Sequence, residues 1–201
     1  SQMLVGVVGI AVPIYADRLG ASPFLIGMVG ATGGLTYSFM PLVSGMLADK
    51  LKRKVLISAS MFSYGFSCIF YSLTEDPFML LFIKALEWIS IAAFWPSIEA
   101  LLADTCEDSL EDTLKTFSIS WSSALIIGPM VGGLLISGYT IKTPFLFSLG
   151  ISFPLGVLSL ILVKEPPRRQ ERSVREGSKI EGRLNDRYSM IAALSSILLT
   201  Y

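Results

Sequence analysis

Residues 45–54 read GMLADKLKRK and form a short charged connection between two long apolar stretches. The apolar stretches, 22–48 and 54–73, each reach the ~20 mostly apolar residues that a membrane-spanning helix needs. Asp49 stands at the head of the connection, and a cluster of basic residues follows it. The members of this cluster are Lys50, Lys52, Arg53 and Lys54.

The chain as a whole has the composition of a membrane protein. Of its 201 residues, 52% are hydrophobic and only 16% are charged, with a mean hydropathy of +0.63. A soluble domain carries about 25% charged residues. A water-soluble helical core is the alternative, but runs this long and almost free of charge argue against it. The further runs of spanning length are 77–102, 114–138 and 143–163.

Two shorter apolar runs, 2–15 and 189–201, each meet a chain end. We interpret them as parts of a first and a seventh span, so that the chain is a piece of a longer membrane protein. The first run has no charged leader and does not resemble a signal peptide.

The lysines and arginines are distributed unevenly along the chain. All but three of the sixteen follow the second, fourth and sixth predicted helices, and the exceptions are Arg18, Lys84 and Lys142. An excess of Lys and Arg marks cytoplasmic loops, whereas acidic residues have little weight. This pattern predicts a cytoplasmic N-terminus and a cytoplasmic segment 164–188. We expect that segment to be a linker that carries a topology signal, with lipid or partner binding as the alternative.

The sequence has no motif that usually marks an enzyme or a metal site. It has no histidine and two cysteines, Cys68 and Cys106, which fall in different segments. This pattern favours neither a disulfide framework nor a metal site. There is no HExxH or GxSxG motif, so we expect no catalytic residue and no cofactor. The sixteen acidic residues balance the basic ones, and we expect no nucleic-acid partner.

The run 77–102 carries ionisable residues at membrane depth. Such a residue is unfavourable by at least ~2.5 kcal/mol and normally faces protein or water. At helical spacing, five polar and aromatic residues share an arc about 120° wide. A water-filled cavity beside this face would explain them, and Glu99 lies near the cytoplasmic end. The alternatives are a structural ion pair or a lysine that extends to the outer surface. The five are Lys84, Glu87, Trp88, Trp95 and Glu99.

Two segments in different runs are similar to each other. Residues 41–47 read PLVSGML and residues 129–135 read PMVGGLL. They lie in the second and fifth predicted helices, which run in opposite directions. Inverted repeats of three helices are a known way of building transporters. The match therefore favours an inverted three-plus-three arrangement.

The charged connection resembles the signature of the major facilitator superfamily. The matching residues are Gly45, Asp49, Lys50, Arg53 and Lys54, while Lys52 replaces the second glycine of the family pattern.

Two further motifs are similar to superfamily motifs. Lys84, Glu87 and Trp88 align with an Arg-x-x-Gln-Gly motif of helix 4. In helix 5, a segment resembles the motif of antiporter members, although Ala124 replaces an upstream glycine. Close helix packing is the alternative explanation of that segment. Its residues are Gly128, Pro129, Gly132 and Gly133.

The resemblance implies an all-α membrane protein. Residues 1–163 would form the N-terminal six-helix bundle with a truncated first helix. Residues 164–188 would be the linker, and 189–201 the start of helix 7 in a missing C-terminal half. The resemblance also implies a latch in which Asp49 meets the other half and the basic residues pair with Asp104. A pure topology signal is the alternative for these basic residues.

The function implied is secondary transport by alternating access, with proton-coupled export of a small molecule. A symporter or facilitator for a sugar or other solute is the alternative, and a membrane-embedded enzyme or receptor is less favoured. The expected partners are membrane lipid, a small-molecule substrate, protons and the missing half. The expected location is the cell membrane.

Overall fold

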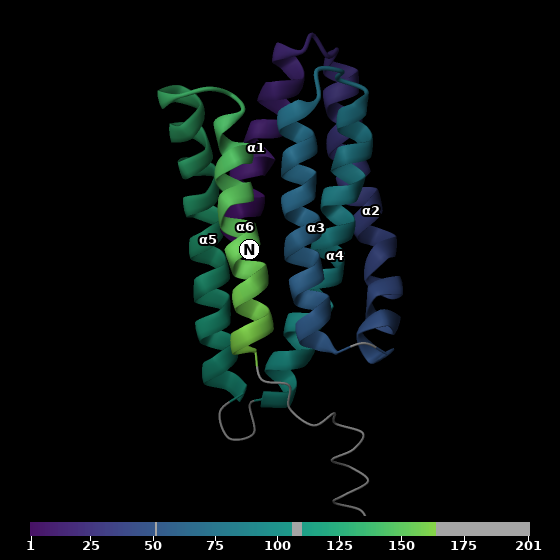
Figure 1. The fold of residues 1–201 in the computed structure, drawn as a ribbon, viewed down its shortest axis with the longest axis vertical. Coiled ribbons are helices and arrows are strands. Elements are labelled where there is room, and N and C mark those ends of the chain that lie inside the picture. The colour runs from purple at the N-terminus through teal and green to yellow at the C-terminus, as the bar shows by residue number, and fades with distance from the viewer. Residues whose placement is uncertain (51, 106–109, 164–201) are drawn as a thin grey trace, which may run out of the picture. The chain divides into compact units, whose positions relative to one another are not determined.

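In the computed structural model the chain is described over residues 1–50, 52–105 and 110–163, and these residues form six helices (Figure 1). Side chains are not described at 41, 47–50, 100, 102–105 and 110–113. The helices are α1 Gln2–Arg18, α2 Pro23–Lys50, α3 Arg53–Leu73, α4 Met79–Thr105, α5 Leu110–Gly138 and α6 Thr143–Leu162.

Every apolar run predicted within residues 1–163 is a helix. Within the described residues, five segments are long and apolar enough to cross a membrane: Pro23–Met46, Arg53–Leu73, Met79–Glu99, Leu114–Gly138 and Thr143–Leu162. The predicted bounds needed small corrections. Helix α1 continues to Arg18 because Tyr15 and Ala16 are buried in the core. Helix α5 starts at Leu110, so Lys115 lies in a helix and not in a connection.

The pairing of helices fits an inverted repeat. Helix α3 packs mainly against α6 and α4, α2 packs against α4, and α1 against α5 and α6. In an inverted repeat α1 corresponds to α4, α2 to α5 and α3 to α6. This exchange turns the α1–α5 contact into the α4–α2 contact and leaves the α3–α6 contact unchanged. The arrangement agrees with the predicted all-α, three-plus-three bundle.

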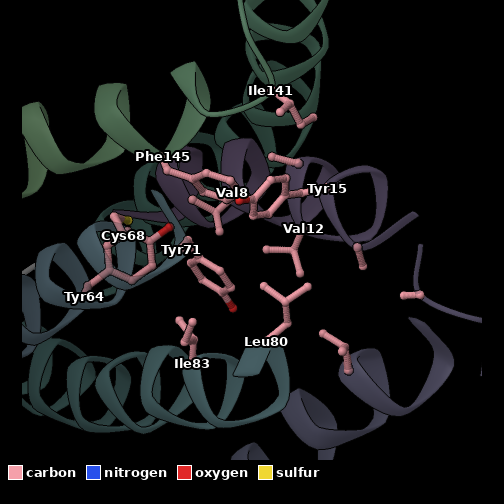
Figure 2. Packing of buried hydrophobic residues seen from close by; sticks show 14 of the residues in the cluster. Val8, Val12, Tyr15, Tyr64, Cys68, Tyr71, Leu80, Ile83, Ile141 and Phe145 are labelled. Carbon is pink, nitrogen blue, oxygen red and sulfur yellow. The ribbon is translucent and has the colours of Figure 1, made fainter. Parts of the chain in front are cut away.

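The centre of the core is aromatic (Figure 2). Phe145 of α6 lies between Tyr71 of α3, stacked at 5.1 Å between ring centroids, and Tyr15 of α1, edge-on at 5.6 Å. The Tyr15 hydroxyl also donates a hydrogen bond to the Thr74 carbonyl after α3. Such aromatic pairs contribute about 0.5–1.5 kcal/mol beyond burial. They join three helices close to the ionisable face of α4.

Helices α1 and α5 approach closely through glycine. A Cβ built on Gly128 would lie 2.6 Å from the Met3 carbonyl oxygen, and one on Gly132 would lie 2.8 Å from the Val7 carbonyl oxygen. Side chains other than hydrogen are therefore excluded at both positions. Small residues permit this approach between membrane helices.

Candidate functional site

A buried ion pair lies on α4. The Lys84 Nζ is 2.9 Å from Glu87 Oε2, one helical turn away. Both residues are buried, with exposed fractions of 7% and 1%. A charge buried in this way needs a partner of opposite charge and further hydrogen bonds. The pair supplies the first of these requirements.

Helix α3 supplies a hydrogen bond to the same carboxylate. The Tyr71 hydroxyl, fully buried, donates to Glu87 Oε2 at 2.9 Å. The other oxygen, Oε1, is buried without a hydrogen-bond partner among the described residues. An unpaired buried acceptor costs about 1–3 kcal/mol.

Trp88 lies close to the lysine of the ion pair and also lines an adjacent cavity. The Lys84 Nζ lies 5.7 Å from the centroid of the Trp88 ring, within the range of a cation–π interaction. On α2, Tyr37 meets the same ring edge-on at 5.5 Å. A Cβ on Gly33 would lie 2.5 Å from the Trp88 Nε1. The ring is thus confined by α2 on one side and by the lysine on another.

The cavity next to Trp88 has a volume of about 350 Å³. This volume lies within the range of small-molecule sites, about 300–1,000 Å³. Trp95 meets Phe117 edge-on at 5.9 Å and Trp121 at 6.4 Å, so α4 and α5 form an aromatic wall. The lining residues, from α1, α2, α4 and α5, are Gln2, Val5, Tyr37, Trp88, Ile91, Trp95, Glu99, Phe117 and Trp121.

The predicted polar face of α4 divides into two parts. Trp88, Trp95 and Glu99 line the cavity. Lys84 and Glu87 are not among its lining residues and are buried inside the bundle, so a coupling or substrate path through them stays a prediction. They are buried because they lie toward α3, whose Tyr71 covers the carboxylate. Of the two alternatives for Lys84, the geometry matches the ion pair and excludes extension to the outer surface.

Several site residues were missed in the sequence. Tyr71 and Tyr37 lie in other helices, and no local signal connects them with α4. Phe117 and Trp121 offered a signal, because aromatic residues four apart share one face of a helix. That spacing in the run 114–138 pointed to an aromatic face on α5.

The helix 2–3 motif is described only in part. The connection is as short as expected, because α2 ends at Lys50 and α3 begins at Arg53. The side chains of Asp49, Lys50 and Asp104 lie outside the described residues, so the contacts of the predicted latch stay a prediction. A Cβ on Gly45 would meet no atom within 4 Å in the described part of the chain.

The helix 5 motif is divided between two faces. Gly128, Pro129 and Gly132 face α1, and the ring of Pro129 would be 2.8 Å from a Cβ built on Gly6. Gly133 has open space beside it within the described bundle. Close packing therefore accounts for the first three residues, and an antiporter role stays a prediction.

Comparison with known proteins gives one family for almost the whole chain. The model of the Major Facilitator Superfamily matches residues 1–200. Multidrug resistance protein 1 of Bacillus subtilis (strain 168) is 26% identical over 176 residues, which cover 87% of this chain and 45% of that protein.

Two further relatives also carry resistance names. Multidrug resistance protein MdtG of Yersinia enterocolitica is 26% identical and covers 76% of this chain and 38% of that protein. Quinolone resistance protein NorA of Staphylococcus aureus is 23% identical and covers 98% of this chain and 50% of that protein. The chain spans half or less of the length of these relatives.

Proposed function

The chain belongs to the Major Facilitator Superfamily and is an integral multi-pass membrane protein, and from this premise we propose that it forms the N-terminal half of a secondary transporter. The six-helix bundle would move against a C-terminal half that begins at 189–201, with 164–188 as a cytoplasmic linker. Alternating access by two such halves exposes a central site to each side in turn. The proposed location is the cell membrane, with a cytoplasmic N-terminus.

We assign the transported molecule to the class of small, amphipathic compounds, moved outward. The observation that carries this proposal is the aromatic cavity of about 350 Å³ between α1, α2, α4 and α5. The resistance names of the relatives agree with export of small molecules. An enzyme or receptor function has less support, because the described cavity offers one carboxylate and no nucleophile–base pair.

Protons are the proposed coupling ion, and Glu87 the proposed proton carrier. Its carboxylate is buried, its Oε2 accepts two hydrogen bonds, and its Oε1 has no partner among the described residues. Glu87 thus combines burial inside the bundle with direct contact to one cation, Lys84. Intramembrane carboxylates commonly serve in proton relays.

The helix 2–3 motif is the proposed gate. Asp49 would stabilise one conformation by lying near the N-terminus of a helix in the other half, a contact typically worth ~0.3–1 kcal/mol. Arg53 or Lys54 would pair with Asp104 at the end of α4. Contacts of this size can be broken and remade during a transport cycle.

The test is transport by the full-length protein in proteoliposomes with an imposed pH gradient. If a small molecule accumulates only while the pH gradient is present, and a protonophore abolishes this accumulation, the result supports proton-coupled export. Equilibration that is independent of the gradient would favour the facilitator alternative. Uptake in the same direction as protons would favour symport, and the absence of any flux would contradict the transport function.

A further inference from the structure

Glu87, the proposed proton carrier, is enclosed within the bundle. Its side chain is 1% exposed, and it is not among the residues that line the aromatic cavity. Lys84 and Tyr71 both contact Oε2, and Oε1 has no hydrogen-bond partner among the described residues. A proton that moves between Glu87 and water therefore needs other groups to carry it.

A second, smaller cavity lies between α1, α3 and α4, and we call it the inner cavity. Gln2, Val5, Ile91 and Trp95 line both this space and the aromatic cavity, so the two are neighbours. Its volume is about 10 Å³, close to the smallest that holds a water molecule, about 10–15 Å³. The other residues that line it are Ser1, Leu4, Met61, Tyr64, Ser90 and Phe94.

Tyr64, which borders the inner cavity, carries a hydroxyl group without a partner. The residue is 2% exposed, and its hydroxyl oxygen is buried with no hydrogen-bond partner among the described residues. Such a group costs about 1–3 kcal/mol when it stays unpaired, and a buried water commonly satisfies it. The Ser90 hydroxyl, 2.7 Å from the Ser63 hydroxyl of α3, offers the same water a second polar partner.

Tyr64 and Glu87 belong to the same contact between α3 and α4. Tyr64 is about two turns from Tyr71 and lies on the same face of α3, and Tyr71 binds Glu87. Ser90 is one turn from Glu87 on α4. The Tyr64 hydroxyl is close enough to the Glu87 carboxylate for the two to interact electrostatically.

Tyr64 differs in one respect from the other titratable groups that surround Glu87. It lines the inner cavity, whereas the others do not. The titratable groups around Glu87 in the described bundle are Tyr64, Cys68 and Tyr71 of α3 and Lys84 of α4.

We propose that the inner cavity holds a water molecule and that Tyr64 relays protons between this water and Glu87. The inference rests on the proposed function, because it names the route by which the proton carrier is reached. A tyrosine hydroxyl both donates and accepts a hydrogen bond. Tyr64 gives its hydroxyl proton toward the carboxylate and takes another from the water, so its own charge is restored. The water regains its proton from the aromatic cavity, and release of the proton follows the same steps in reverse.

The experiment measures how fast Glu87 gains a proton in the purified full-length protein. A light flash releases protons from 2-nitrobenzaldehyde, and time-resolved infrared absorption follows the carbonyl band of protonated carboxyl groups. The band that is missing in E87Q belongs to Glu87. In Y64F we expect this band to reach its wild-type amplitude but to rise at least roughly tenfold more slowly, because a positioned proton donor accelerates transfer by about 10²–10⁴-fold. A residue with a packing role alone would not change the rate while leaving the amplitude unchanged.

Three variants accompany this measurement. Y139F alters a tyrosine that is 76% exposed and should leave the rate unchanged. S90A removes a hydroxyl from the inner cavity and should slow the Glu87 band, and it tests the proposal independently if Y64F does not fold. S97A is the matched control, because the Ser97 hydroxyl is also buried but bonds to the Ala93 carbonyl of its own helix, so the rate should not change.

The proposal is overturned if the Glu87 band rises as fast in Y64F as in the wild type, or if S97A slows it as much as S90A does. It is also overturned if E87Q loses no band, and that result contradicts the assignment of Glu87 as proton carrier as well. Failure of transport is a separate result. A protein in which Y64F slows the Glu87 band, but which moves no small molecule across a membrane, contradicts transport and leaves the relay in place.

Discussion

The Tyr71 hydroxyl lies 2.9 Å from Oε2 of Glu87 and joins α3 to the ionisable residues of α4. The same oxygen accepts a hydrogen bond from the Lys84 ammonium, also at 2.9 Å. Tyr71 also stacks on Phe145 of α6, so the carboxylate is connected to the aromatic core. A change in the charge of Glu87 would therefore act on packing between three helices as well as on Lys84.

The first prediction concerns Glu87 as proton carrier. In E87Q the side chain keeps its shape but cannot gain or lose a proton. We expect accumulation driven by a pH gradient to fall to the background level, while exchange of labelled substrate across the membrane without a gradient continues. The matched control is E75Q, which removes an exposed carboxylate. Unchanged pH dependence in E87Q would remove Glu87 from the mechanism.

The second prediction concerns the Tyr71 hydroxyl. In Y71F the ring still stacks on Phe145, but Glu87 loses a donor. Loss of one partner in a buried hydrogen bond to a charged group should lower the free energy of unfolding by about 1–3 kcal/mol. Thermal unfolding in detergent measures this change. Y139F, at a tyrosine that is 76% exposed, should have no effect. Equal stability of Y71F and wild type would mean that the hydrogen bond contributes nothing.

The third prediction concerns Lys84. K84M leaves a buried carboxylate without its cation, and breaking a buried pair in this way destabilises by about 3–5 kcal/mol. The double variant K84M/E87Q removes both charges and should regain most of that loss. Thermal unfolding of the two variants, beside K142M at the start of α6, measures the difference. A double variant as unstable as K84M would show that the charge on Glu87 is not the cause.

The face of α4 shows how far sequence spacing could go. Helical periodicity places Lys84, Glu87, Trp88, Trp95 and Glu99 within one arc of the helix. An arc about 120° wide, however, can meet two neighbours at once. One edge of this arc meets Tyr71 of α3, and the other opens toward α2 and α5.

The relative positions of the helices decide which residues of the arc are buried, and a single sequence does not give these positions.

The glycines of α2 could not be distinguished in the sequence for the same reason. Four of them, at 27, 30, 33 and 34, look alike in the sequence, yet only Gly33 meets a neighbouring side chain in the described structure. By contrast, the positions of α2 to α6 followed from apolar run length, because a membrane span requires a minimum number of apolar residues.

The fourth prediction uses this difference between adjacent glycines. A Cβ on Gly33 would lie 2.5 Å from the Trp88 Nε1, whereas one on Gly34 would meet open space. G33A should therefore displace the indole and weaken binding of an aromatic ligand in the cavity, while G34A should not. Ligand titration of both variants measures this. Equal affinities for the two variants would mean that Trp88 is free to move and does not shape the cavity.

The fifth prediction separates packing from function in the helix 5 motif. Because the Gly132 position lies against the Val7 carbonyl of α1, G132A must push two backbones apart. Overpacking of this kind typically costs about 1–3 kcal/mol. G133A adds the same methyl group beside open space and should be neutral, or stabilising by up to ~1 kcal/mol through helix propensity. Thermal unfolding of the two variants gives the comparison. If G132A is as stable as the wild type but its transport no longer depends on the proton gradient, the antiporter interpretation is favoured over close packing. If G132A is unstable and G133A is not, packing alone accounts for Gly132.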